Sequence, residues 1–280
     1  MSIRFHCESR TFFLDTQHTS YVMQVNPYGH LLHLYYGPSV GEGDFTALYP
    51  GEDRGFSPSY YEDRLERNFS PDVLPQEYTG CNVGDFRLSC LSVADEQGVW
   101  GADFHYLSHE IQKGKYHLNG LPSAHEGEEK GETLIIRLQD PVTHLVVELL
   151  YGVFPQQDVI TRALRLINQG TQTLRLDKVA SLCLDIPFGC WDLIHFHGRH
   201  TMERQMQRLP LADCIHTISS TRGASSHHHN PFVILCDPEA GETHGVCYGV
   251  MLVYSGNYRM DVEKTQNGLV RLTAGISSGI

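Results

Sequence analysis

The sequence has few basic residues and no long apolar run. Lys and Arg together number 21 against 33 Asp and Glu, which gives a formal net charge of -12 at pH 7. A chain of this charge repels phosphate backbones and anionic lipid surfaces. The longest apolar run, Leu145 to Leu150, is broken by Glu148 and is far shorter than the ~20 residues that cross a bilayer. We therefore expect neither nucleic acid nor a membrane as a partner.

Paired cysteine motifs are also missing. The 8 cysteines are scattered, with no Cys-x-x-Cys spacing, which argues against a zinc ribbon and against a thioredoxin-like redox site. The first residues, Met1 to Glu8, lack the basic segment followed by an apolar one that is typical of a secretory signal. Reduced cysteines and a cytoplasmic location are the expectation.

Motifs for nucleophilic catalysis and for phosphate binding are absent as well. There is no Gly-x-Ser-x-Gly elbow and no Gly-x-x-x-x-Gly-Lys-Ser/Thr loop. Acidic residues are plentiful, but no two of them can be placed as a catalytic pair from spacing alone. The residues by themselves therefore predict no catalytic centre.

What the sequence does contain is alternation of apolar and polar residues with period two, which predicts strands with one buried face. Turn segments such as Asn26-Pro-Tyr-Gly29 separate these strands. The predicted strands are 11–15, 20–25, 30–36, 86–93, 133–138, 144–151, 159–167, 173–184, 191–197, 214–219, 232–236, 246–254, 258–264 and 269–273. One short helix is expected at Thr201–Gln207, with Thr201 as its cap and Pro210 beyond its end.

No linker, repeat or change of composition divides the chain. We therefore predict one domain over residues 1–280, an all-β fold of two large antiparallel sheets packed face to face, with few short helices. Two stretches lack the strand period. Residues 37–84 are much longer than the ~12–15 residues of an ordinary loop and so indicate a functional or partner-contacting segment. Residues 113–131 are expected to form a solvated loop.

One pattern resembles a metal site. His195-Phe-His197, with His200 and Glu203 beyond it, places two imidazoles on one face of a strand, as in the His-x-His motif of cupins. The spacing to Glu203 is longer than in cupins, and histidines that only pair with neighbouring strands are the simpler interpretation. His227-His-His229 is similarly explained by a loop or an interface. We therefore expect no metal and no cofactor.

The long segment also carries residues suited to sugar binding. Asp53 and Asp85 lie beside arginines and aromatic residues, and carboxylate, guanidinium and aromatic ring are the groups that bind a neutral polyol. Structural ion pairs would explain the same residues equally well.

From this segment onward the sequence carries a series of distinctive motifs along the chain. They are Asp53-Arg-Gly-Phe-Ser-Pro58, Glu66-Arg-Asn-Phe-Ser-Pro-Asp-Val-Leu-Pro-Gln-Glu-Tyr78, Gly84-Asp-Phe-Arg87, His109-Glu-Ile-Gln-Lys-Gly-Lys115, Leu118-Asn-Gly-Leu-Pro122, Glu203-Arg204, Arg208-Leu-Pro-Leu211 and Ser219-Ser-Thr-Arg-Gly-Ala-Ser-Ser-His-His-His-Asn-Pro-Phe232. In these motifs and in their order, the whole chain resembles the N-terminal region of bacterial α-galactosidases of glycoside hydrolase family 36.

The resemblance implies a galactose mutarotase-like β-supersandwich that precedes a catalytic (β/α)₈ barrel and a C-terminal domain. In that family two aspartates of the barrel hydrolyse the glycosidic bond with retention. This chain has no Lys-Trp-Asp motif and no residues left over for a barrel of roughly 250 residues, so we expect it to be inactive by itself. It would serve as an accessory and oligomerisation domain of an enzyme acting on melibiose- or raffinose-type substrates, with the barrel and like subunits of a homotetramer as partners.

The resemblance also assigns two substrate-binding residues. In tetrameric family members the long loop reaches a neighbouring subunit, where an aspartate and an arginine bind the galactosyl unit. By motif these are Asp53 and Arg67, with Arg64 as an alternative to Arg67. Two further hypotheses stay open: a free-standing carbohydrate-binding module, and the cupin-like metalloenzyme built on His195, His197 and Glu203.

Overall fold

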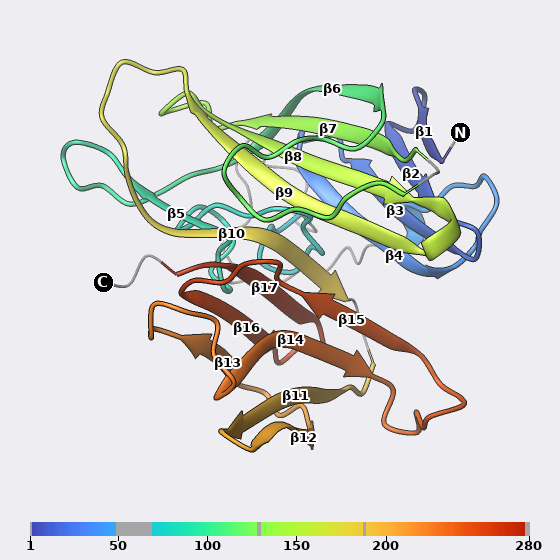
Figure 1. The fold of residues 1–280 in the computed structure, drawn as a ribbon. Helices are drawn as coiled ribbons and strands as arrows, with labels where there is room; N and C mark the ends of the chain where they lie inside the picture. The colour runs from blue at the N-terminus through green and yellow to red at the C-terminus, as the bar shows by residue number, and fades with distance from the viewer. Residues whose placement is uncertain (1, 49–68, 128–129, 187–188, 278–280) are drawn as a thin grey trace.

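The computed structural model describes residues 2–48, 69–127, 130–186 and 189–277, and its regular structure is almost entirely β-strand (Figure 1). The first strands are β1 (Ile3–His6), β2 (Thr11–Asp15), β3 (Thr19–Val25), β4 (Leu31–Pro38), β5 (Leu91–Ala94), β6 (His105–Lys113), β7 (Glu132–Gln139) and β8 (Leu145–Phe154). They are followed by β9 (Val159–Asn168), β10 (Arg175–Ile186), β11 (Asp192–Arg199), β12 (Met202–Pro210), β13 (Ile215–Ser220), β14 (His229–Cys236), β15 (Cys247–Met251), β16 (Tyr258–Lys264) and β17 (Val270–Ile276). Two 3-10 turns, η1 (Thr46–Leu48) and η2 (Pro155–Gln157), complete the described elements, none of which is an apolar helix of membrane-spanning length.

The strands form four small sheets. In the order of hydrogen-bonded neighbours, the first sheet is β1-β2-β3-β4, the second is β6-β7-β8-β9, the third is β13-β16-β17-β10-β5 and the fourth is β12-β11-β14-β15. The strand pairs within them are antiparallel. One buried cluster draws side chains from all four sheets, among them Phe12, Leu149, Leu272 and Leu235. The apolar faces therefore share a single core.

Direct hydrogen bonds join successive sheets around this core. At the junction of the first and second sheets, the Glu132 carboxylate accepts hydrogen bonds from the Ser2 amide at 2.7 Å and from the Ile3 amide at 3.0 Å. Between the second and third sheets, the Arg162 guanidinium on β9 donates to the Cys183 carbonyl on β10 at 2.6 Å.

The remaining two junctions complete a ring. The Tyr258 hydroxyl on β16 donates to the His229 carbonyl on β14 at 2.8 Å and joins the third sheet to the fourth. The Tyr248 hydroxyl on β15 donates to the Tyr36 carbonyl on β4 at 2.6 Å and joins the fourth sheet back to the first. The four sheets thus form a propeller-like ring around the shared core (Figure 1).

The prediction of two large sheets, and with it the supersandwich, is wrong. The all-β class and the scarcity of helix agree with the structure, but the strands divide into four sheets of four or five strands each. Period two reveals which face of a strand is buried and says nothing about where one sheet ends and the next begins. Register shifts also bend individual strands, as between Ala180 and Leu182 of β10 and between Tyr106 and Ser108 of β6.

Two local predictions are also corrected. The segment predicted as a helix, Thr201–Gln207, lies in the turn and edge strand of the β11–β12 hairpin, because Thr201 has a φ of 65° and β12 pairs with β11. The 113–131 stretch is more than a solvated loop. Its Tyr116 and Leu118 pack against Leu150 and cover part of the outer face of the second sheet.

Candidate functional site

The sugar-binding residues expected from the resemblance, Asp53 and Arg67, lie outside the described residues, and so does the alternative Arg64. The structure does describe where the chain enters and leaves their segment. On the entry side, the ring of Phe45 packs against the ring of Phe13 with centroids 5.7 Å apart. On the exit side, Phe69 is buried.

The described residues on either side of the 49–68 segment pack on the first sheet. Phe69 stacks on Tyr28 with ring centroids 4.0 Å apart and lies 5.6 Å from the ring of His30. Phe45, Phe13 and Phe69 belong to one apolar cluster on this sheet, away from the shared core. Phe45 and Phe69 therefore lie on the same face of this sheet.

A buried charge cluster fixes the chain after this exit. Arg271 on β17 has no exposed surface, donates twice to Asp185 at 2.7 Å and lies 2.9 Å from Asp85. Arg87 donates to both oxygens of Asp85. Gln76 donates to Asp185 from its backbone amide at 2.9 Å and to Asp85 from its side chain at 2.7 Å. Burial alone would raise the pKa of Asp85, but the charges of Arg271 and Arg87 lower it to about 2.

This cluster answers the question that the sequence left open for Asp85. Its carboxylate is buried, and it bonds to protein groups from segment 70–87 and from β17. Asp85 is therefore a structural anchor of the segment, as the ion-pair interpretation predicted. The neighbouring motif residue Glu77 is also buried. It accepts hydrogen bonds from Tyr21 at 2.7 Å and Tyr151 at 2.8 Å and pairs with Arg162 at 2.8 Å.

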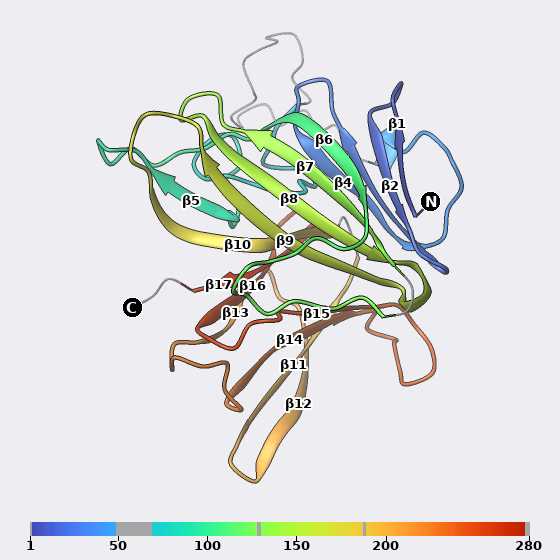
Figure 2. The ribbon, with the colours of Figure 1, turned by 45° about the horizontal axis from the view of Figure 1, so that its top comes forward.

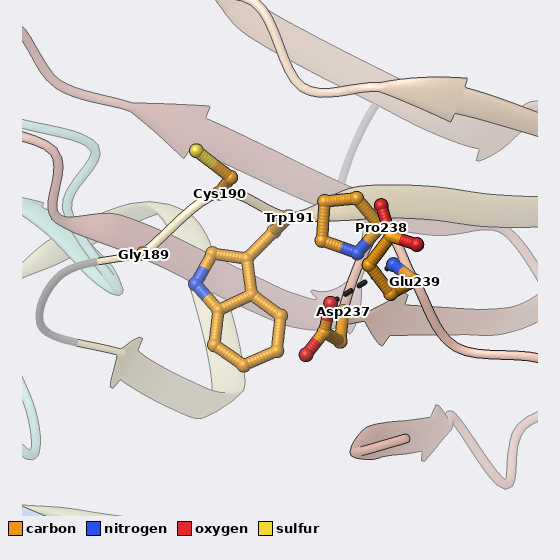
Figure 3. A pocket seen from close by; sticks show the side chains of 6 residues that line it. All are labelled: Gly189, Cys190, Trp191, Asp237, Pro238 and Glu239. Carbon is orange, nitrogen blue, oxygen red and sulfur yellow. Dashed lines mark hydrogen bonds between the residues drawn. The ribbon is translucent and has the colours of Figure 1, made fainter. Parts of the chain in front are cut away.

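A shallow pocket lies at the start of the fourth sheet, far from the charge cluster in sequence (Figure 3). Its volume is about 510 Å³, and it is lined by Gly189, Cys190, Trp191, Asp237, Pro238 and Glu239. The Trp191 indole packs against the Tyr248 ring with centroids 5.6 Å apart. An indole face beside two carboxylates can stack on the apolar face of a pyranose and accept hydrogen bonds from its hydroxyls.

One arginine holds the wall of this pocket in place. Arg208 on β12 donates to the carbonyls of Asp237 at 3.0 Å, Pro238 at 2.7 Å and Ala240 at 2.7 Å. Its remaining nitrogen donates to Asp192 at 2.6 Å. The conformation of the 237–240 turn is thus set by a side chain from the far edge of the fourth sheet. The family motif at Arg208 gave no sign of this contact with the 237–240 turn, because the two segments meet only in the folded protein.

The possible metal ligands are arranged differently from the expectation. Of the residues that the structure describes, only His30, Asp103 and His105 bring three ligand atoms within 4.8 Å of one another. His195 and His197 lie 6.0 Å apart by ring centroid, and Glu203 instead accepts a hydrogen bond from the Thr201 amide at 2.9 Å. The structure therefore does not assemble the cupin-like set.

Comparison with known proteins identifies the family of the chain. A family model described as "Glycosyl hydrolase family 36 N-terminal domain" matches residues 29–279. The chain belongs to this family. The resemblance found in the sequence motifs is thereby confirmed, as is the position of this family 36 domain at the N-terminal side of its relatives.

Several relatives of this family 36 domain are known. The bifunctional alpha-galactosidase/sucrose kinase AgaSK of Mediterraneibacter gnavus is 43% identical over 278 residues, which are 99% of this chain and 30% of AgaSK. The solved galactosidase domain of AgaSK gives a TM-score of 0.94 at 43% identity and is matched over 98% of this chain and 38% of its own. Alpha-galactosidase AgaA of Geobacillus stearothermophilus, solved in complex with raffinose, gives a TM-score of 0.91 at 40% identity over 95% of this chain and 37% of its own. This chain spans about a third of the length of such relatives.

Proposed function

We propose that this chain is the non-catalytic N-terminal part of an α-galactosidase that releases terminal α-galactosyl residues from melibiose- or raffinose-type oligosaccharides with retention. The observation that carries the proposal is the family match over residues 29–279, combined with relatives that are named alpha-galactosidases. The two catalytic aspartates would lie in a barrel that follows the region matched here.

We assign the 49–68 segment a role in binding the galactosyl unit of a neighbouring subunit. Asp53 would accept hydrogen bonds from sugar hydroxyls, and Arg67 or Arg64 would donate to them. The positions of Phe45 and Phe69, the described residues on either side of the segment, support this role, because both side chains pack on the first sheet. A segment anchored in this way loses less conformational freedom when it meets a substrate.

The outer face of the fourth sheet is the surface that we assign to contact with the barrel or with like subunits of a tetramer. Met206 and Met251 are each 65% exposed, and between them the rings of Phe196 and Phe232 stack with centroids 5.5 Å apart. The register places Met206 opposite Phe196 and Met251 opposite Phe232. This apolar row crosses all four strands of a sheet whose β11–β12 hairpin projects from the body (Figure 2). Exposed apolar surface of this kind is typical of a protein contact.

We further propose that the chain works in the cytoplasm. All eight cysteines are free thiols in the structure, including Cys236 and Cys247, which face each other across β14 and β15. Free thiols at cross-strand positions fit a reducing compartment, where disulfides do not persist.

Kinetics of the longer enzyme test the sugar-binding role. We expect Asp53→Asn to lower kcat/KM for melibiose by about tenfold to 150-fold, because losing one hydrogen bond to a charged group costs about 1.5–3 kcal/mol. Asp63→Asn, which removes a carboxylate from the same segment, is the matched control and should leave kcat/KM within a few fold. Equal effects of the two variants would refute the assignment of Asp53.

The accessory role has a separate test. The purified 280-residue chain should release no galactose from melibiose, while the longer protein should turn it over. Turnover by the isolated chain, free of contaminating enzyme, would overturn the proposal.

A second function, sugar binding by this chain alone, is favoured by the Trp191 pocket. Calorimetry with galactose and raffinose should then detect binding that Trp191→Ala abolishes. Trp100, the other of the two tryptophans, lies away from the pocket beside Arg175, so Trp100→Ala is the control and should leave binding unchanged. No heat from the unmodified chain would remove this second function.

A further inference from the structure

The structure brings together two histidines and one aspartate that no motif connects. His30 is the residue before β4, and Asp103 and His105 flank the start of β6. The Nε2 atom of His30 lies 3.1 Å from one carboxylate oxygen of Asp103, and the Nε2 atom of His105 lies 2.9 Å from the other. Each oxygen of a single carboxylate thus faces one imidazole nitrogen.

The hydrogen bonds of His105 define the chemistry of this cluster. Its Nδ1 atom lies 3.0 Å from the carbonyl oxygen of Tyr28. A carbonyl only accepts, so Nδ1 carries a proton, and a neutral His105 then has a bare Nε2 lone pair directed at Asp103. A lone pair facing a carboxylate is repulsive unless a positive charge lies between them, supplied either by a second proton on the ring or by a cation.

The arrangement approaches what a zinc site needs. A ligating histidine usually donates its other ring N–H to a carbonyl or carboxylate, as His105 does to Tyr28. Bonds of about 2.0–2.1 Å in a tetrahedral site place neighbouring ligand atoms about 3.3 Å apart. In the cluster the two imidazoles face different oxygens of Asp103, and one ligand atom from each residue lies within 4.8 Å of the other two, so a shift of the side chains by roughly 1 Å would bring all three onto one ion.

The surroundings of the cluster also favour a bound cation. His30 is buried, and Asp103 is mostly buried, with 15% of its side chain exposed. A second carboxylate, that of the buried Asp140, accepts a hydrogen bond from the Asp103 amide at 2.9 Å. Two carboxylates in a region of low dielectric stabilise positive charge between the histidines.

From this arrangement we propose that His30, Asp103 and His105 bind one divalent transition-metal ion, with zinc as the best match for two imidazoles and a carboxylate. Three protein ligands leave a fourth position for water. The ion would join the turn before β4 to the start of β6. His30 also contacts Phe69, so the ion would stiffen the exit of the 49–68 segment. The proposal does not depend on the enzymatic role proposed above.

Metal titration of the purified chain tests the proposal. Zinc, and cobalt as its spectroscopic substitute, should bind with a stoichiometry of one and raise the melting temperature. His105→Gln and Asp103→Asn should each weaken zinc binding at least about tenfold while the metal-free melting temperature changes little. His227→Ala/His228→Ala removes one exposed and one half-buried imidazole elsewhere and should keep the full affinity, which separates the site from adventitious binding.

A measurement on the unmodified chain tests the proposal even if a variant fails to fold. In histidine side-chain ¹⁵N NMR, zinc should shift the Nε2 resonances of His30 and His105 and leave the Nδ1 proton of His105 in place. Zinc binding that survives both His105→Gln and Asp103→Asn would overturn the proposal. So would a titration that leaves the His30 and His105 resonances unmoved, since the cluster would then be a protonated ion-pair network.

Discussion

Replacing Arg271 by Met tests whether the buried charge cluster holds the segment that follows the long loop. The Arg271 guanidinium has no exposed surface and faces the carboxylates of Asp185 and Asp85. Without Arg271, the buried Asp185 carboxylate loses its closest guanidinium partner, although Arg87 still pairs with Asp85. Breaking a buried ion pair from one side costs about 3–5 kcal/mol. For a protein of this size we expect the melting temperature to fall by roughly 6–20 °C.

The pH dependence gives a sharper test of the same cluster. In the wild type the pKa of Asp85 is depressed to about 2, so its ionisation contributes stability above about pH 4, the usual value, which is lost as the pH falls toward 2. Without Arg271 the buried Asp85 carboxylate takes up a proton more readily in the folded state. The loss of stability in Arg271→Met relative to the wild type should therefore be largest at pH 7 and become smaller as the pH approaches 4.

Thermal melts of both proteins between pH 4 and pH 7 measure this deficit. Arg165→Met is the control, because the Arg165 side chain is 55% exposed and its buried partner Glu148 keeps its ion pair with Arg137, so the loss of stability should be smaller. Adding Asp185→Asn to Arg271→Met should restore part of the lost stability by removing the stranded charge. A loss below about 1 kcal/mol, or a deficit that does not change with pH, would refute the reasoning.

Three further predictions follow from the fold. Tyr248→Phe removes the hydrogen bond to the Tyr36 carbonyl that closes the ring and should cost about 0.5–1.5 kcal/mol in urea unfolding; no loss would contradict the role of that bond. Burial and neighbouring histidines lower the pKa of His195, so the unfolded chain binds its proton more readily and stability should fall as the pH drops below about 6.5; His195→Gln should flatten that part of the curve. Met206→Lys with Met251→Lys should reduce self-association in light scattering at unchanged melting temperature, and undiminished association would place the contact elsewhere.

The strands were predictable because their chemistry is local. In β8, for example, the apolar run is broken only by Glu148, and the structure explains this residue through the guanidinium groups of Arg137 at 2.8 Å and Arg165 at 2.6 Å on the two neighbouring strands. The grouping of strands into four sheets was not predictable, because it depends on contacts between distant residues such as Tyr36 and Tyr248.

The helix predicted near Thr201 shows how a cap signal can mislead. Thr201 and the alternating polar residues after it fit a short exposed helix, but they equally fit an edge strand whose outward side chains all meet solvent. The pairing of β12 with β11 decided between the two. A strand in which nearly every residue is exposed carries little periodic signal.

Some of the candidate site residues were indicated by the sequence, and others were not. Asp53 and Arg67 came from family motifs and stay predictions. The sequence did carry one signal for the metal cluster that was not used: Asp103 and His105 are two apart, so they share one face of an extended chain. No such signal connected His30 to Asp103 and His105, or Trp191 to Asp237 in the shared pocket. These residues are distant in sequence and meet only in the folded protein.

The contact that closes the ring limits how early the fold can be completed during synthesis. Tyr36 leaves the ribosome 212 residues before its partner Tyr248. The first two sheets can pair their strands while translation continues, since their neighbours are close in sequence. Their apolar inner faces nevertheless stay partly exposed until β15 has been synthesised. During this stage the nascent chain presents an apolar surface that a chaperone can bind.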